Sequence, residues 1–222
     1  MDVDIETSLD AQRVADLTGV ESIQIHNCGL CHIDADMVSR ALLEYDTENL
    51  DLLILENIGN LVCPAEFDTG AHKNVMLLSV PEGDDKPLKY PLMFQVSDLV
   101  LINKIDTLEY FDFDFEVAKE RILKLNPNAV VLPVSAKTGE GIERVMDWIM
   151  EERESYNYFR YKKGFPVIEG RSFLKNGLII YISYMRAVRF RLKSFCHKGK
   201  HTFEYLTFIV ADRAEDARYI FF

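Results

Sequence analysis

The sequence has no long hydrophobic run and few cysteines. Its longest apolar stretch, LIIYISYM at 178–185, is far shorter than the roughly 18 residues that a transmembrane helix requires. Its first ten residues, MDVDIETSLD, are acidic and polar and do not resemble a secretory signal. Four cysteines in 222 residues, without such a signal, indicate a reducing compartment where clustered cysteines more often serve metal or redox chemistry than disulfides. These absences argue against a membrane protein and predict a cytoplasmic one.

Basic residues are scarce in the first two-thirds of the chain. Residues 1–150 hold 11 Lys and Arg against 28 Asp and Glu, which disfavours nucleic-acid binding because that binding depends on neutralising phosphates. Residues 151–222 reverse the balance, with 14 basic and 8 acidic residues, and they hold 16 of the 24 Phe and Tyr. The change predicts a core domain at 1–152 and a basic, aromatic-rich extension of unknown structure at 153–222.

Apolar runs alternate with amphipathic stretches through the first domain. Expected strands lie at 50–55, 75–80, 98–106 and from 129 onward, and expected helices at 33–46, 87–97 (interrupted by Pro91), 114–126 and 142–154. Such alternation predicts an α/β fold with a parallel sheet and helices on both faces. Ligands of such sheets bind beyond the carboxyl ends of the strands, where the polar clusters of this sequence fall.

Two of these clusters, NKID at Asn103–Asp106 and SAK at Ser135–Lys137, suit guanine recognition. The carboxylate of Asp106 is able to accept two hydrogen bonds from the guanine edge, and adenine lacks that pair of donors. The Lys104 stem is able to lie along the base plane, and Asn103 to join adjacent loops. Backbone N–H groups of Ser135–Lys137 are suited to bind the guanine carbonyl. A chance match to the short NKID pattern is the alternative, and a second matching loop one strand later makes it weaker.

A third cluster follows the strand that ends in LLILENIGN. Glu56 stands where nucleotide hydrolases keep a carboxylate near Mg²⁺, and Gly59 where a backbone N–H approaches the terminal phosphate. Taken alone, this pattern is also that of an ordinary strand-to-loop turn.

Cys31, His32 and Cys63 are candidate metal ligands. Thiolate and imidazole suit Zn²⁺ or Ni²⁺, and three ligands are one short of a closed tetrahedral site. Adjacent residues Cys31 and His32 can share one ion only in a loop, which Gly29 permits. One alternative is a redox pair formed by Cys28 and Cys31, and another is a buried, purely structural Cys63. Cys28 is also open as an additional metal ligand.

Five segments together resemble the HypB-type GTPases, the nickel-incorporation proteins of hydrogenase maturation, which are related to urease accessory GTPases. They are GLCHIDADMV, LLILENIGNLVCPAEFD, PEGDDKPLKYP, VLINKID and VSAKTGEG, and the resemblance covers about Met1–Met150. It implies a P-loop NTPase-like fold and a cytoplasmic, GTP-regulated metallochaperone that dimerises with nucleotide. Its implied partners are a hydrogenase large-subunit precursor and a companion nickel accessory protein, without nucleic acid or membrane.

The resemblance also implies roles for single residues. It makes Cys31, His32 and Cys63 the Ni²⁺ or Zn²⁺ ligands at a dimer interface, and Glu56 and Gly59 the Mg²⁺ and phosphate-sensing switch. It assigns guanine specificity to the following residues: Asn103, Lys104, Asp106, Ser135, Ala136 and Lys137. It makes Asp4 the switch carboxylate near Mg²⁺ and the attacking water.

The sequence departs from this family in two respects. No G-x-x-x-x-G-K-[ST] motif occurs, and the family's phosphate loop precedes the position of Asp4. We therefore expect the first strand and the P-loop to be missing. We also expect GTP hydrolysis by this chain alone to be negligible. The extension is either a packing or partner-binding segment, an RNA-binding tail, or unrelated sequence joined to a fragment, and its composition favours the last. The remaining alternatives are a Ni- or Zn-binding protein without nucleotide hydrolysis and a GTPase of the translation-factor type.

Overall fold

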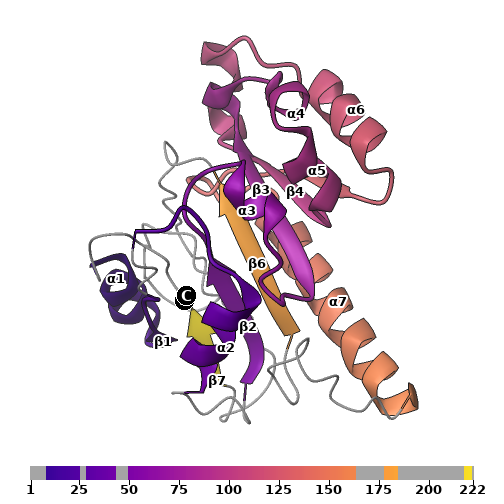
Figure 1. Cartoon of the computed structure of the whole chain (residues 1–222). Helices are drawn as coiled ribbons and strands as arrows, with labels where there is room; N and C mark the ends of the chain where they lie inside the picture. Colours follow the sequence, from indigo (N-terminus) through magenta and orange to yellow (C-terminus); the bar gives the residue numbers. More distant parts are fainter. Residues whose placement is uncertain (1–8, 26–28, 44–49, 164–177, 185–217, 222) are drawn as a thin grey trace.

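A seven-stranded sheet forms the centre of the structure (Figure 1). The computed structural model describes residues 9–25, 29–43, 50–163, 178–184 and 218–221. The strands are β1 (Glu21–Ser22), β2 (Leu50–Glu56), β3 (Lys73–Ser79), β4 (Leu99–Asn103), β5 (Val130–Pro133), β6 (Leu178–Tyr184) and β7 (Arg218–Phe221). Their spatial order is β1-β7-β2-β6-β3-β4-β5, and every neighbouring pair is parallel. The expected parallel α/β architecture is therefore confirmed.

Capping side chains and a proline mark the ends of several helices. They are α1 (Leu9–Thr18), α2 (Ala35–Leu42), α3 (Cys63–Glu66), α4 (Lys86–Lys89), α5 (Pro91–Val96), α6 (Phe115–Leu125) and α7 (Ile142–Lys163), with 3₁₀ turns η1 (Val80–Glu82) and η2 (Ile105–Tyr110). Asp34 and Asp114 cap α2 and α6 by accepting hydrogen bonds from backbone N–H groups in the first turn. Pro91 separates α4 from α5, as the sequence predicts. Among the described residues, no helix is both long and apolar enough to cross a bilayer.

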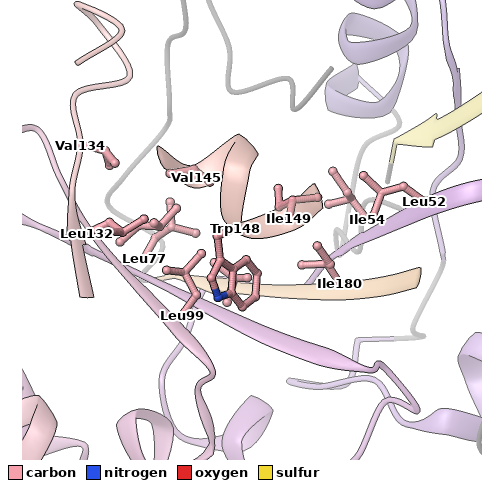
Figure 2. Close-up of a cluster of buried hydrophobic side chains, with 12 residues drawn as sticks. Leu52, Ile54, Leu77, Leu99, Leu132, Val134, Val145, Trp148, Ile149 and Ile180 are labelled. Atoms are coloured by element: carbon pink, nitrogen blue, oxygen red, sulfur yellow. The ribbon is translucent and has the colours of Figure 1, made fainter. Parts of the chain in front are cut away.

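Helices cover both faces of the sheet. On one face, α7 packs Val145, Trp148 and Ile149 against inward side chains of the central strands (Figure 2). On the other face, α2 covers β2, while α5 and α6 cover β3 and β4. Successive residues of each central strand therefore enter different clusters, which explains why these strands read as continuous apolar runs.

The strand β6 lies between β2 and β3, drawn in orange at the centre of Figure 1. Ile180 of β6 pairs with Ile54 of β2 on one side and with Lys73 of β3 on the other. Its side chain is 1% exposed and belongs to the cluster under α7. The place between β2 and β3 is thus filled by a segment of the C-terminal region. The proposed domain boundary at 152 stays a prediction, and α7 runs through it.

Candidate functional site

The polar loops of the sequence analysis leave one edge of the sheet. β2 ends at Glu56, β4 at Asn103 and β5 at Pro133, and these strands run in the same direction. Their carboxyl ends therefore share the edge at which ligands of parallel sheets bind.

Asn103 joins the two loops that were assigned to guanine. Its side chain is 1% exposed, and its Oδ1 accepts a hydrogen bond from the backbone N–H of Ala136 at 3.1 Å. A second link runs from the Ile105 N–H to the Val134 carbonyl at 3.2 Å. The structure thus confirms that Asn103 fastens the NKID loop to the SAK loop.

Asp106 is held by the neighbouring loop. The Ser135 hydroxyl donates to its Oδ1 at 2.6 Å, and the Lys137 ammonium lies 3.8 Å from its Oδ2. The Lys137 side chain is 79% exposed, so the ion pair contributes little and the Ser135 hydrogen bond is what orients the carboxylate. An oriented carboxylate at this edge can accept two N–H groups of a planar base.

Lys104 precedes Asp106 in a left-handed backbone conformation, with φ of 64°. It is the one non-glycine residue with positive φ among those the structure describes. Such a conformation costs about 1–3 kcal/mol and persists only where neighbours hold it. Here the N–H and hydroxyl of Thr107 both donate to the Lys104 carbonyl, at 2.9 and 2.7 Å. The chain turns at Lys104, which ends β4 earlier than the expected strand at 98–106.

The SAK loop closes tightly against β5. The Ser135 N–H donates to the Glu140 carbonyl at 2.9 Å, and the Gly139 N–H donates to the Ser135 carbonyl at 2.8 Å. Gly141 has φ of 77°, and a Cβ atom there would lie 2.2 Å from the Pro133 carbonyl oxygen. Only glycine fits this position, and the loop depends on it for its shape.

Glu56 and Gly59 lie on the loop after β2. Glu56 is the last residue of that strand and is half-buried, as is Gly59. Between them, Asn57 is 1% exposed, and its Oδ1 accepts from the Ile58 N–H at 2.7 Å. Asp4, assigned to the same switch, lies outside the described residues.

Cys31 and Cys63 come together although 32 residues separate them. Their Sγ atoms are 2.8 Å apart, with Cys31 exposed and Cys63 half-buried at the first turn of α3. Gly29, with φ of 80°, precedes Cys31 in a loop, as the shared-site hypothesis requires. His32 Nδ1 lies 3.8 Å from Cys31 Sγ. Cys28 falls outside the described residues.

The donor chemistry of these three side chains fits a thiophilic transition metal. Metal–sulfur distances of about 2.3 Å place two sulfurs about 3.3 Å apart in a square-planar site and about 3.8 Å apart in a tetrahedral one, so the sulfurs have to separate by about 0.5–1 Å. As they stand, no three Cys, His, Asp or Glu side chains within the described part of the chain are arranged to hold an ion. The hydrogen bond with Cys31, followed by desolvation, raises the pKa of the Cys63 thiol above its ordinary value.

Two residues beside the cysteines were not singled out from the sequence. Phe67 stacks on the His32 ring, with centroids 3.5 Å apart and planes 9° from parallel. Asn60 hydrogen-bonds to backbone groups of both cysteines. The available signals were an asparagine three residues before a helix start and an aromatic side chain four residues after Cys63, and neither is specific.

Comparison with known proteins decides the family. Residues 3–133 match the family model described as "CobW/HypB/UreG, nucleotide-binding domain". The chain belongs to this family. It is 47% identical over 150 residues to the "Hydrogenase maturation factor HypB" of Azotobacter vinelandii, covering 68% of this chain and 49% of that protein. It is 43% identical over 159 residues to the "Hydrogenase/urease maturation factor HypB" of Helicobacter hepaticus, covering 70% and 65%.

Solved structures agree with this assignment. A crystal structure of HypB from Helicobacter pylori in complex with nickel superposes with a TM-score of 0.64 at 39% identity, covering 70% of this chain and 74% of that one. HypB from Archaeoglobus fulgidus superposes with a TM-score of 0.62 at 35% identity, covering 69% and 73%. The HypB-type resemblance and the P-loop NTPase-like fold are thus confirmed. The chain spans about half the length of the Azotobacter relative that it matches.

Proposed function

We propose that this chain handles nickel in hydrogenase maturation, binding guanine nucleotide through Asn103–Asp106 and Ser135–Lys137 and Ni²⁺ through Cys31, His32 and Cys63. The observation that carries the proposal is the 2.8 Å separation of the Cys31 and Cys63 sulfurs at the loop that follows Glu56. Family membership supports it, because matched relatives are hydrogenase maturation factors and one solved relative is in complex with nickel. Zn²⁺ suits the same donors.

The loop after β2 carries residues assigned to both nucleotide and metal, which gives a physical route for coupling. Gly59 is the residue to which we assign sensing of the terminal phosphate, and Cys63 follows it by four residues. We assign Mg²⁺ to Glu56 and Asp4. When nucleotide and Mg²⁺ order this loop, the position of Cys63 changes. Three protein donors leave a metal site one ligand short, and a second copy of the chain is the proposed source of the remainder.

The wider biological setting is part of the proposal as well. A hydrogenase large-subunit precursor is the recipient of the metal, a companion nickel accessory protein is the partner, and the cytoplasm is the location. The expectation that this 222-residue chain alone hydrolyses GTP negligibly stays a prediction, and phosphate release at saturating GTP measures it.

A nickel titration in competition with a chromophoric chelator tests the metal site. We expect Cys63→Ala to weaken Ni²⁺ binding at least tenfold, because a thiolate ligand is lost. Cys196→Ala makes the same chemical change at a cysteine that we leave out of the site, and it should bind Ni²⁺ like the unmodified chain. Equal affinities of all three proteins would show that Cys63 is no ligand.

A second candidate is a metal-binding protein of the same fold that retains no nucleotide. The meeting of Cys31 and Cys63 is equally compatible with it, because their contact involves none of the residues assigned to guanine. Equilibrium binding of a fluorescent guanine nucleotide separates the two: saturable binding that GDP displaces and ADP does not supports the first, and no binding supports the second.

A further inference from the structure

One side chain connects the two cysteine segments. The Asn60 Nδ2 donates a hydrogen bond to the Cys31 carbonyl at 2.9 Å. Its Oδ1 accepts hydrogen bonds from the N–H groups of Val62 and Cys63, both at 3.1 Å. The carboxamide of Asn60 therefore spans from the loop of the first thiol to the backbone of the second.

Asparagine is chemically suited to this position. Its carboxamide is a donor at one end and a double acceptor at the other, so it satisfies a carbonyl and two N–H groups at once. An aspartate keeps the acceptor end but has no donor for the Cys31 carbonyl, and an alanine keeps neither end. The geometry therefore uses both ends of the Asn60 side chain.

The other side of the cysteine loop is braced separately. The Ala35 N–H donates to the Asp68 carbonyl at 2.9 Å, and His32 stacks on Phe67. These contacts hold the loop at the far end of α3, while Asn60 holds it beside Cys31 itself. Apart from the contact between the two sulfurs, Asn60 is therefore the side chain that links the backbone at Cys31 to the backbone at Cys63. It immediately follows Gly59.

We infer that Asn60 is a positioning residue of the metal site: it sets the separation of Cys31 and Cys63, and it passes movement of the Gly59 loop to both. This inference rests on the proposed function, because it presumes that the two thiols bind metal. Residues that orient metal ligands in this way typically change metal affinity by about 10- to 100-fold when they are replaced.

The test compares Asn60→Ala and Asn60→Asp with Asn128→Ala, the same change at an exposed asparagine in the loop before β5. Ni²⁺ affinity is measured by chelator competition, and the thiolate-to-metal charge-transfer band by absorption. We expect Asn60→Ala to weaken Ni²⁺ binding about tenfold and to shift that band, while Asn128→Ala changes neither.

Asn60→Asp gives a test of sign. An added carboxylate near a cation should strengthen binding if charge alone matters, whereas loss of the link to the Cys31 carbonyl should weaken it if position matters. We expect weaker Ni²⁺ binding. Thermal unfolding of the metal-free variants distinguishes an effect on stability from an effect on the metal site. A merely structural change lowers the unfolding midpoint but leaves the Ni²⁺ affinity and the absorption spectrum unchanged.

The possible outcomes distinguish this inference from the function on which it rests. If Cys63→Ala weakens Ni²⁺ binding and both Asn60 variants bind like the unmodified chain, the positioning inference is wrong and the metal site stands. If Cys63→Ala itself has no effect, the metal site is wrong. Tighter binding by Asn60→Asp also overturns the inference, since it leaves charge as the only influence.

Discussion

Ile180 offers the sharpest test of the architecture, because it lies in the strand that sequence patterns did not place. The side chain is 1% exposed and packs in the cluster that includes Ile54 of β2 and Trp148 of α7 (Figure 2). Replacing a buried isoleucine by alanine costs about 2–5 kcal/mol, and the cost is greatest where surroundings cannot collapse into the cavity. β6 has strands on both sides, so we expect Ile180→Ala to lower the free energy of unfolding by about 3–4 kcal/mol.

Urea denaturation followed by fluorescence measures this change. Trp148 is the single tryptophan of the chain and lies in the same cluster as Ile180, so its emission reports on the packing in question. The matched control is Val130→Ala in β5, where the side chain is 36% exposed and the expected loss is below about 1 kcal/mol. Ile180→Val, with an expected loss of about 0.5–1.5 kcal/mol, keeps the test possible if the alanine variant does not fold.

The reasoning fails if Ile180→Ala costs no more than Val130→Ala at an unchanged urea slope. Such a result means that residue 180 is not buried in the sheet, and that the place between β2 and β3 is not filled by β6. A loss of about 3–4 kcal/mol for Ile180→Ala, with the loss for Ile180→Val smaller than that for Ile180→Ala, confirms the central position of this strand.

Three further predictions concern the site and its loops. Asp106→Asn should weaken guanine nucleotide binding about 10- to 100-fold and improve binding of xanthine nucleotide, whose carbonyl pairs with the new amide, as measured by competition with a fluorescent nucleotide. Gly141→Ala should lower the unfolding midpoint much more than Gly19→Ala, because both have positive φ but only at Gly141 does the added Cβ meet backbone, 2.2 Å from the Pro133 oxygen; equal shifts in the two variants would contradict the clash. Burial raises the pKa of Glu82 in the fold, despite a backbone hydrogen bond and nearby lysines that lower it. Its carboxyl group therefore ionises more easily in the unfolded chain, so the fold loses stability progressively as pH rises from the unfolded pKa through the folded one. In urea unfolding, the free energy of unfolding of Glu82→Gln should rise relative to that of the unmodified chain as the pH increases from 4 to 7. A difference between the two proteins that stays constant across this range would refute the assignment.

The strands between residues 50 and 133 were predictable because helices cover both of their faces. β2, β3 and β4 contribute alternate side chains to different clusters, and so the residues in the middle of each strand are apolar. The end of β4 was placed too late, because the left-handed turn at Lys104 has no distinct sequence signal. β6 and β7 were not predicted, since parallel pairing between segments more than a hundred residues apart leaves no local pattern.

The candidate site was predictable to a similar extent. The NKID and SAK loops meet as the sequence suggests, and Cys31 and Cys63 lie together as the shared-site hypothesis requires. Their binding of guanine and metal stays a prediction. Asn60 was not predicted, because its role depends on two loops that meet only in the folded structure. In the sequence, a polar residue after a glycine is typical of any loop.

The position of β6 has a consequence for how this chain is made. Both neighbours of β2 in the sheet, β6 and β7, are synthesised after residue 177. At about 5–20 residues per second, the ribosome needs roughly 5–20 s to advance from the end of β3 to the start of β6. Throughout that time β2 and the near side of β3 expose unpaired backbone, the kind of edge to which other polypeptides adhere. Nascent chains should therefore depend on chaperones until the ribosome has released residues 178–184 and 218–221.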